Sequence, residues 1–214
     1  METTFQDLGI SFSLYKAPIK EASGYRGLGT CSICHTPQQH LFDAEEYGKE
    51  DSEVTACHSC LKAGKAIIVK DTEYGLITSE QIDTLMTHPV PMSKEEMNKS
   101  GFEEVIVEED EDFGVWVSRK LTKNIVTELA STPNFISWQG ERWLFCCQHP
   151  MTYKGVWKIE DFHKNAPNNG KQFFETIVED IEEGLWDEKF GDCVTYYVFE
   201  CKKCKRLRVY WDMA

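Results

Sequence analysis

Long apolar runs are absent from this 214-residue sequence. The runs that do occur, such as Ala66 to Val69, are far shorter than the roughly 20 residues that a membrane-spanning helix needs. The first residues, Met1 to Asp7, lack both the basic start and the apolar segment of a secretory signal peptide. These absences predict a cytoplasmic protein with no membrane partner.

A surplus of basic charge is also missing. The chain has 36 acidic and 23 basic residues, for a net charge of −13. Nucleic-acid-binding proteins ordinarily carry a basic surplus, because neutralising phosphates supplies much of their affinity. The composition therefore predicts no nucleic-acid partner and favours a basic protein partner, steered by opposite charge. Solubility alone is the alternative explanation of an acidic composition.

Familiar catalytic motifs and linkers are absent as well. The sequence has no His-Glu-x-x-His, no nucleophile elbow and no phosphate-binding loop. It has no internal repeat, low-complexity segment or Pro/Gly-rich linker. We therefore predict a non-enzymatic protein with one α+β domain over residues 1–214. An N-terminal lobe with two cysteine knuckles and a C-terminal ribbon-like hairpin complete the predicted architecture, and two lobes divided near 108–112 are the alternative.

The spacing of apolar residues predicts the secondary structure. An alternating pattern indicates strands, and apolar residues three and four apart indicate helices. The predicted elements are a short strand within 1–30, short helices at 61–67 and 93–98, a helix with Ser79 as its N-cap, strands at 104–108 and 114–117, a helix over 121–129, strands within 135–147 around a Gln139-Gly140 turn, a helix over 174–185, and strands at 194–200 and 207–211.

The nine cysteines are the most informative feature. Disulfides do not persist in a reducing cytoplasm, so paired cysteines there indicate metal ligands. Cys31-x-x-Cys34 and Cys57-x-x-Cys60 are separated by 22 residues. Two thiolates on one tight turn bind one ion, and two such turns complete a tetrahedron, which predicts structural zinc. Four thiolates leave no position for a water molecule, so we expect no catalysis at this site.

A third Cys-x-x-Cys pair, Cys201 and Cys204, lies near the C-terminus. Cys146, Cys147 and His149 are the candidates that complete a second site. Our preferred set is Cys147, His149, Cys201 and Cys204, which gives three thiolates and one imidazole. In the alternatives Cys146 replaces His149, or the C-terminal pair holds no metal and Cys146 is a small core residue.

Two acidic segments are candidate partner-binding surfaces. A strongly charged stretch most often forms a solvated face, so charge alone does not assign a role to any single residue. The candidates are Glu108, Glu109, Asp110, Glu111 and Asp112 in one segment, and Glu179, Asp180, Glu182 and Glu183 in the other.

Three further features together resemble a known family. Residues 138–144 read Trp-Gln-Gly-Glu-Arg-Trp-Leu and are followed by Cys147 and Gly155, and Phe199 precedes the C-terminal pair. With the N-terminal cysteine pairs, these features resemble the CbrC-like (UPF0167) colicin-tolerance family. The chain departs from the family pattern at Cys146, where the family has histidine, and at Met151, where it has cysteine.

The resemblance implies protection rather than catalysis. It implies a zinc-binding immunity protein that neutralises a toxin by binding a basic, nuclease-type toxin domain. A zinc-dependent hydrolase is one alternative. A zinc-ribbon module that contacts nucleic acid through the basic residues 202–208 is another. The sequence predicts no oligomeric state.

Overall fold

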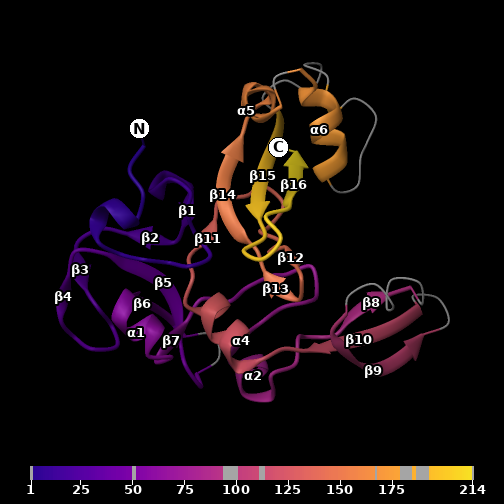
Figure 1. Cartoon of the computed structure of the whole chain (residues 1–214). Coiled ribbons are helices and arrows are strands. Elements are labelled where there is room, and N and C mark those ends of the chain that lie inside the picture. Colours follow the sequence, from indigo (N-terminus) through magenta and orange to yellow (C-terminus); the bar gives the residue numbers. More distant parts are fainter. Residues whose placement is uncertain are drawn as a thin grey trace.

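A computed structural model describes residues 2–49, 52–93, 101–110, 114–166, 168–178, 185–186 and 193–213. The fold is mixed α+β, as predicted. Figure 1 shows an N-terminal lobe, a C-terminal sheet with two helices, and a three-stranded hairpin unit that projects from the body. None of the helices in the described ranges is long and apolar enough to cross a membrane.

The N-terminal lobe is built on small antiparallel sheets. The single strand expected within residues 1–30 is instead divided into short 3-10 helices and two-residue strands. Phe5 and Phe42 pack at the centre of the lobe. Its elements are η1 (Gln6–Leu8), η2 (Ile19–Glu21), β1 (Ala22–Ser23), β2 (Tyr25–Arg26), β3 (Gly29–Thr30), β4 (Pro37–Gln38), β5 (Leu41–Glu46), β6 (Glu53–Cys57), α1 (His58–Lys62) and β7 (Ala66–Ile67).

Two helices follow in the middle of the chain. α2 (Ser79–Thr84) begins one residue earlier than predicted, because Thr78 rather than Ser79 is its N-cap and forms a capping box with Gln81. α4 (Lys123–Ala130) confirms the helix predicted from apolar spacing. It buries Ile125 and Leu129 against the core.

The hairpin unit confirms the two strands predicted on either side of the acidic segment. Its strands are β8 (Val90–Met92), β9 (Glu103–Asp110) and β10 (Gly114–Lys120), in the order β8-β10-β9. The turn of helix expected at 93–98 lies almost entirely outside the described residues.

The region 134–150 is mostly irregular, so the prediction of strands across 135–147 is largely wrong. Only β11 (Asn134–Phe135), β12 (Phe145–Cys146) and β13 (His149–Pro150) form there. Trp143 explains the departure from strand geometry, since it is fully buried and its indole N–H donates to the carbonyl of Met151.

The C-terminal sheet has the order β14-β15-β16 and two helices beside it (Figure 1). The strands β15 and β16 confirm the predicted ribbon-like hairpin. The predicted helix over 174–185 is α6, which ends at Ile177 because Val178 is extended. The elements are β14 (Thr152–Trp157), α5 (Ile159–Asn165), α6 (Gly170–Ile177), β15 (Val194–Glu200) and β16 (Leu207–Met213).

The main core joins the N-terminal lobe to the C-terminal sheet. Phe135 stacks on Tyr153 with ring centroids 4.7 Å apart and also contacts Phe199. A smaller core lies around Phe162 and Phe174 on α5 and α6. The four cysteines Cys31, Cys57, Cys60 and Cys201 belong to the main core. The single-domain organisation over residues 1–214 stays a prediction.

Candidate metal centres

The turn between β3 and β4 presents Cys31 and Cys34. The N–H of Cys31 donates to the carbonyl of Thr36 at 3.0 Å, and the N–H of His35 donates to the carbonyl of Cys31 at 2.9 Å. His35 has a φ of +56°, a left-handed conformation that is uncommon outside glycine. This residue closes the turn, so the two thiols lie on the same side of it.

Cys57 and Cys60 reach the same point from a strand–helix junction. Cys57 ends β6 and is the N-cap residue of α1, whose first turn carries Cys60. The sulfurs of Cys31 and Cys60 are 3.8 Å apart, and those of Cys34 and Cys57 are 3.9 Å apart. We call these four residues the first cysteine group; their sulfurs all lie within 4.8 Å of one another.

The turn between β15 and β16 repeats the geometry of the β3–β4 turn. The N–H of Cys201 donates to the carbonyl of Arg206 at 2.9 Å, and the N–H of Lys205 donates to the carbonyl of Cys201 at 3.1 Å. Lys205 has a φ of +61° and occupies the position of His35. Cys201 and Cys204 therefore form the same kind of cysteine turn.

Cys146 and Cys147 complete a second cysteine group with Cys201 and Cys204. They lie in the tight β12–β13 hairpin, where Cys147 and Gln148 both have positive φ values of +54° and +59°. Two successive positive φ values define a type I′ turn, which normally needs glycine or asparagine. The turn brings the sulfurs of adjacent cysteines within 3.8 Å, and the sulfur of Cys146 lies 3.5 Å from that of Cys204.

The predicted second ligand set contained His149, and the structure brings Cys146 to that position instead. His149 starts the return strand β13, opposite Cys146 in the hairpin register. It lines a cleft of about 250 Å³ beside Thr122 and Ile125. The sequence pointed to Cys146 only as an alternative, and no local signal distinguished the two residues.

The spacing of the sulfurs fits one tetrahedral ion in each group. With Zn–S bonds of about 2.3 Å, a regular tetrahedron of sulfurs has edges of roughly 3.8 Å. The closest contacts in both groups, 3.5 to 3.9 Å, agree with that edge. A disulfide would need about 2.05 Å between sulfurs, so none of the eight thiols is bonded to another.

Hydrogen bonds to sulfur lower the pKa and favour thiolate at Cys31 and Cys34 in the first group and at Cys204 in the second. The Thr36 side chain and backbone lower the pKa of Cys34 to about 6, and the hydroxyl of Thr36 lies 2.9 Å from that sulfur. The backbone N–H of Arg206 and the neighbouring thiols lower the pKa of Cys204 to about 7. Burial raises the pKa of Cys60 and of Cys146. Metal binding requires thiolate, so these lowered pKa values favour the protonation state that binds a metal ion.

Most of the acidic residues proposed to bind a partner lie outside the described residues. Glu108 and Glu109 are exposed on β9, and Asp110 ends that strand. Glu111, Asp112, Glu179, Asp180, Glu182 and Glu183 lie outside the described residues.

Two groups of four cysteines on an α+β fold define a protein with two candidate metal centres. The sequence model of the uncharacterised protein family UPF0167 matches residues 10–213, and the chain therefore belongs to that family. The matched region contains both cysteine groups and confirms the predicted resemblance to UPF0167. The description of the family names no activity. Comparisons with curated proteins and with solved structures gave no significant match.

Proposed function

We propose that this protein is a non-enzymatic zinc-binding protein that neutralises a basic protein toxin through its acidic surface. The observation that carries the proposal is the presence of two separate groups of four thiols, each with the spacing of a tetrahedral ion. Zinc in such sites links segments of the chain and adds directly to folding stability.

The chemistry of the donors favours zinc. Cysteine thiolates select soft or borderline metals, and a tetrahedral set of four sulfurs is typical of zinc or of an iron–sulfur centre. The Cys-x-x-Cys turns here are separated by long segments, unlike the closely spaced cysteines of the common ferredoxin patterns. The first group would hold one zinc ion through Cys31, Cys34, Cys57 and Cys60, and the second group would hold another through its own four thiolates.

A zinc ion whose four coordination positions are all taken by protein sulfurs argues against the hydrolase alternative. A catalytic zinc ion keeps one position open for water or substrate, whereas four protein sulfurs close the shell. A hydrolase at the second group would also need a nearby base, and His149 faces a cleft beside Thr122 rather than the four thiols. The role of zinc in the proposal is therefore structural.

The nucleic-acid alternative rests on the basic β15–β16 turn, whose lysines have local partners. Lys202 forms an ion pair with Glu128, and Lys205 forms one with Glu200. Lys203 donates to the carbonyl of Cys147. These contacts tie the turn that carries Cys201 and Cys204 to neighbouring segments. A gel shift at moderate salt tests this alternative, since the proposal expects no bound nucleic acid.

The acidic surface supports a basic partner. A net charge of −13 steers a cationic protein toward the chain, and nuclease-type toxins must be basic to hold nucleic acid. The resemblance to a colicin-tolerance family points to the same class of partner. Binding of this kind weakens steeply as the salt concentration rises.

Two measurements test the proposal. Elemental analysis of gently purified protein should find two zinc ions per chain. Co-expression with the product of the neighbouring gene should give a copurifying complex and rescue growth from toxicity, and the complex should weaken with salt. Metal-free folded protein would contradict the zinc assignment, and a tight, salt-independent complex would contradict the electrostatic mechanism.

A further inference from the structure

The edge strand β9 exposes a run of apolar side chains. Val105, Ile106 and Val107 are 45%, 50% and 57% exposed. No other three consecutive large apolar residues are exposed in the part of the chain that the structure describes. Isolated exposed apolar residues are ordinary on protein surfaces, but a contiguous run on a strand edge is an interaction site or an aggregation hazard.

Among the described residues, β9 pairs on one side only, with β10. An edge strand offers unpaired backbone N–H and C=O groups along its free side. β9 is eight residues long, above the most common strand length of about five to six residues. The free edge therefore offers both backbone hydrogen bonds and an apolar centre to an added strand.

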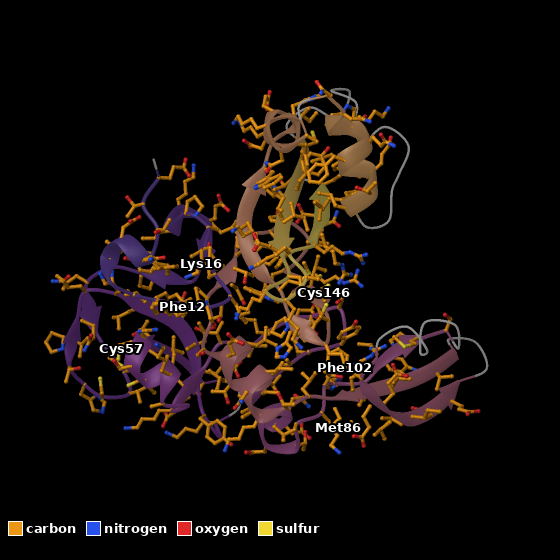
Figure 2. The ribbon with its side chains drawn as sticks, viewed as in Figure 1. Phe12, Lys16, Cys57, Met86, Phe102 and Cys146 are labelled. Carbon is orange, nitrogen blue, oxygen red and sulfur yellow. The ribbon has the colours of Figure 1, made fainter. Side chains whose placement is uncertain are left out.

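The base of the hairpin is held firmly by the body of the protein. Glu104 of β9 forms an ion pair with the buried Arg119 of β10, with 3.3 Å between the charged atoms. The guanidinium of Arg119 lies 4.2 Å from the ring centroid of Tyr74. Phe102, which Figure 2 labels at the root of the hairpin, packs against Tyr74 and Phe145. A fixed strand loses little conformational entropy when a partner adds to it.

Charge excludes a second copy of the chain as the occupant. An antiparallel pairing of two β9 strands centred on Ile106 would place Glu103 opposite Glu109 and Glu104 opposite Glu108. Like charges directly opposite one another destabilise a strand pair. The β-bulge near Val107, where the register with β10 shifts, further opposes flat edge-to-edge stacking.

We propose that β9 is the docking edge for its partner and takes up one extended strand whose apolar centre is flanked by lysine or arginine. The exposed Glu108 and Glu109 at one end would pair with one basic flank, and Glu103 at the other end, whose ion pair with Lys120 is open to solvent, would pair with the other. The Val105–Val107 centre would pack against the apolar residues between them. This inference rests on the proposed function, because it names the part of the acidic surface that contacts the basic partner.

The test selects a displayed library of random nine-residue peptides on the full-length, zinc-loaded protein at low salt. Selected peptides should carry lysine or arginine at both ends and valine, isoleucine or threonine in the centre. A synthetic copy of a selected peptide should slow amide hydrogen exchange across residues 103–109 by at least tenfold, because it supplies backbone hydrogen bonds.

Two variants probe the side chains. Val107→Lys and Ile106→Lys should each weaken the peptide at least tenfold, and Val107→Lys retains the native β9–β10 pairing because Val107 lies in the bulge. Val156→Lys is the matched control, since Val156 is also exposed and apolar but lies on β14. It should bind the peptide as the unmodified protein does.

Distinct failures of this test have distinct meanings. Basic peptides that protect a different segment would overturn the docking role of β9 and leave the acidic-surface proposal standing. Selection of peptides without basic residues, or of none, would overturn the docking role of β9, whereas the acidic-surface proposal is decided by the copurification and its salt dependence.

Discussion

The two cysteine groups share one half of their architecture and differ in the other. Each contains a Cys-x-x-Cys turn at the end of a two-stranded hairpin, closed by a left-handed residue, His35 or Lys205. In the first group the remaining thiols come from a strand–helix junction. In the second they come from Cys146, the last residue of β12, and from Cys147, the first residue of the two-residue turn that follows.

The groups also differ in burial. Cys31, Cys57 and Cys60 are buried, and only Cys34 of the first group is exposed. In the second group only Cys201 is buried, while Cys147 and Cys204 are exposed. Figure 2 shows Cys57 within the N-terminal lobe, whereas Cys146 lies near the root of the hairpin unit.

This difference teaches that one type of turn can serve two purposes. The first group cross-links strands and a helix that make up the core of the lobe, so its metal would hold that lobe together. The second group joins the β12–β13 turn to the C-terminal hairpin. Gln148 in this turn donates to the carbonyl of Gly101, just before β9. The second metal would therefore fix the position of the projecting hairpin unit more than the stability of the core.

Removing a buried thiol from the first group should have the largest effect. Cys57→Ser should lower the zinc content from two ions to one, and should destabilise folding by about 4 kcal/mol or more, the range typical of a lost metal site.

Cys204→Ser should also lower the zinc content by one ion, but should destabilise folding by only about 1–2 kcal/mol, because its group lies at the rim of the core. Elemental analysis and urea unfolding measure both quantities.

Cys193→Ser is the control for both variants, since Cys193 is exposed and belongs to neither group. It should keep two zinc ions and the stability of the unmodified protein. Equal destabilisation by Cys57→Ser and Cys204→Ser would break the comparison.

A competing chelator should distinguish the two ions by their rate of release. The exposed thiolates of Cys147 and Cys204 allow an incoming ligand to attack, whereas release from the first group requires opening of the core. Release followed with a coloured zinc indicator should therefore show two phases of equal size. Cys204→Ser should remove the fast phase, and a single phase in the unmodified protein would count against two environments.

Lys70 is a buried ionisable residue that belongs to neither cysteine group, so it tests the stability of the core apart from the metal sites. It is fully buried, lies 5.3 Å from the ring centroid of Trp143 and donates to the side chain of Asn134. Burial lowers the pKa of Lys70 to about 7, although Glu141 acts in the opposite direction. Above pH 7 the folded protein releases this proton while the unfolded chain, with a pKa near 10.5, keeps it.

The unfolded state therefore binds more protons between pH 7 and 10.5, and the contribution of Lys70 to stability rises with pH there. The slope reaches up to about 1.4 kcal/mol per pH unit. Lys70→Met should remove this slope at constant free zinc, as measured by urea unfolding at pH 7 and pH 9. Parallel pH profiles for the two proteins would contradict a neutral buried lysine.

The smallest effect is expected at His149. His149→Ala should leave two zinc ions bound and change stability by less than about 0.5 kcal/mol, because its imidazole lies outside the four thiols. Cys146→Ser is the matched variant and should lose one ion. The opposite pattern would restore the ligand set predicted from the sequence.

Local patterns predicted the elements whose geometry depends on near neighbours. Apolar spacing predicted α4, and the apolar residues at 105–107 and 115–117 predicted the strands β9 and β10. The Cys-x-x-Cys spacing predicted the turns that carry Cys31 and Cys201, since a turn of six residues determines how its two thiols lie. The predicted knuckle at Cys57 and Cys60 is instead a strand–helix junction. Residues 135–147 resisted prediction, because their aromatic side chains fill a core instead of alternating across a strand.

The sequence by itself determined that this chain carries cysteine turns with metal-ligand spacing, a surplus of acidic residues and an α+β fold, because these features follow from composition and short-range spacing. Only the tertiary structure decided that Cys146 rather than His149 lies with Cys201 and Cys204. More than 50 residues separate these segments, and the packing of the β12–β13 turn against the β15–β16 hairpin, which no local pattern records, brings the thiols together. Tertiary packing also decided that three thiols of the first group are buried but only one of the second.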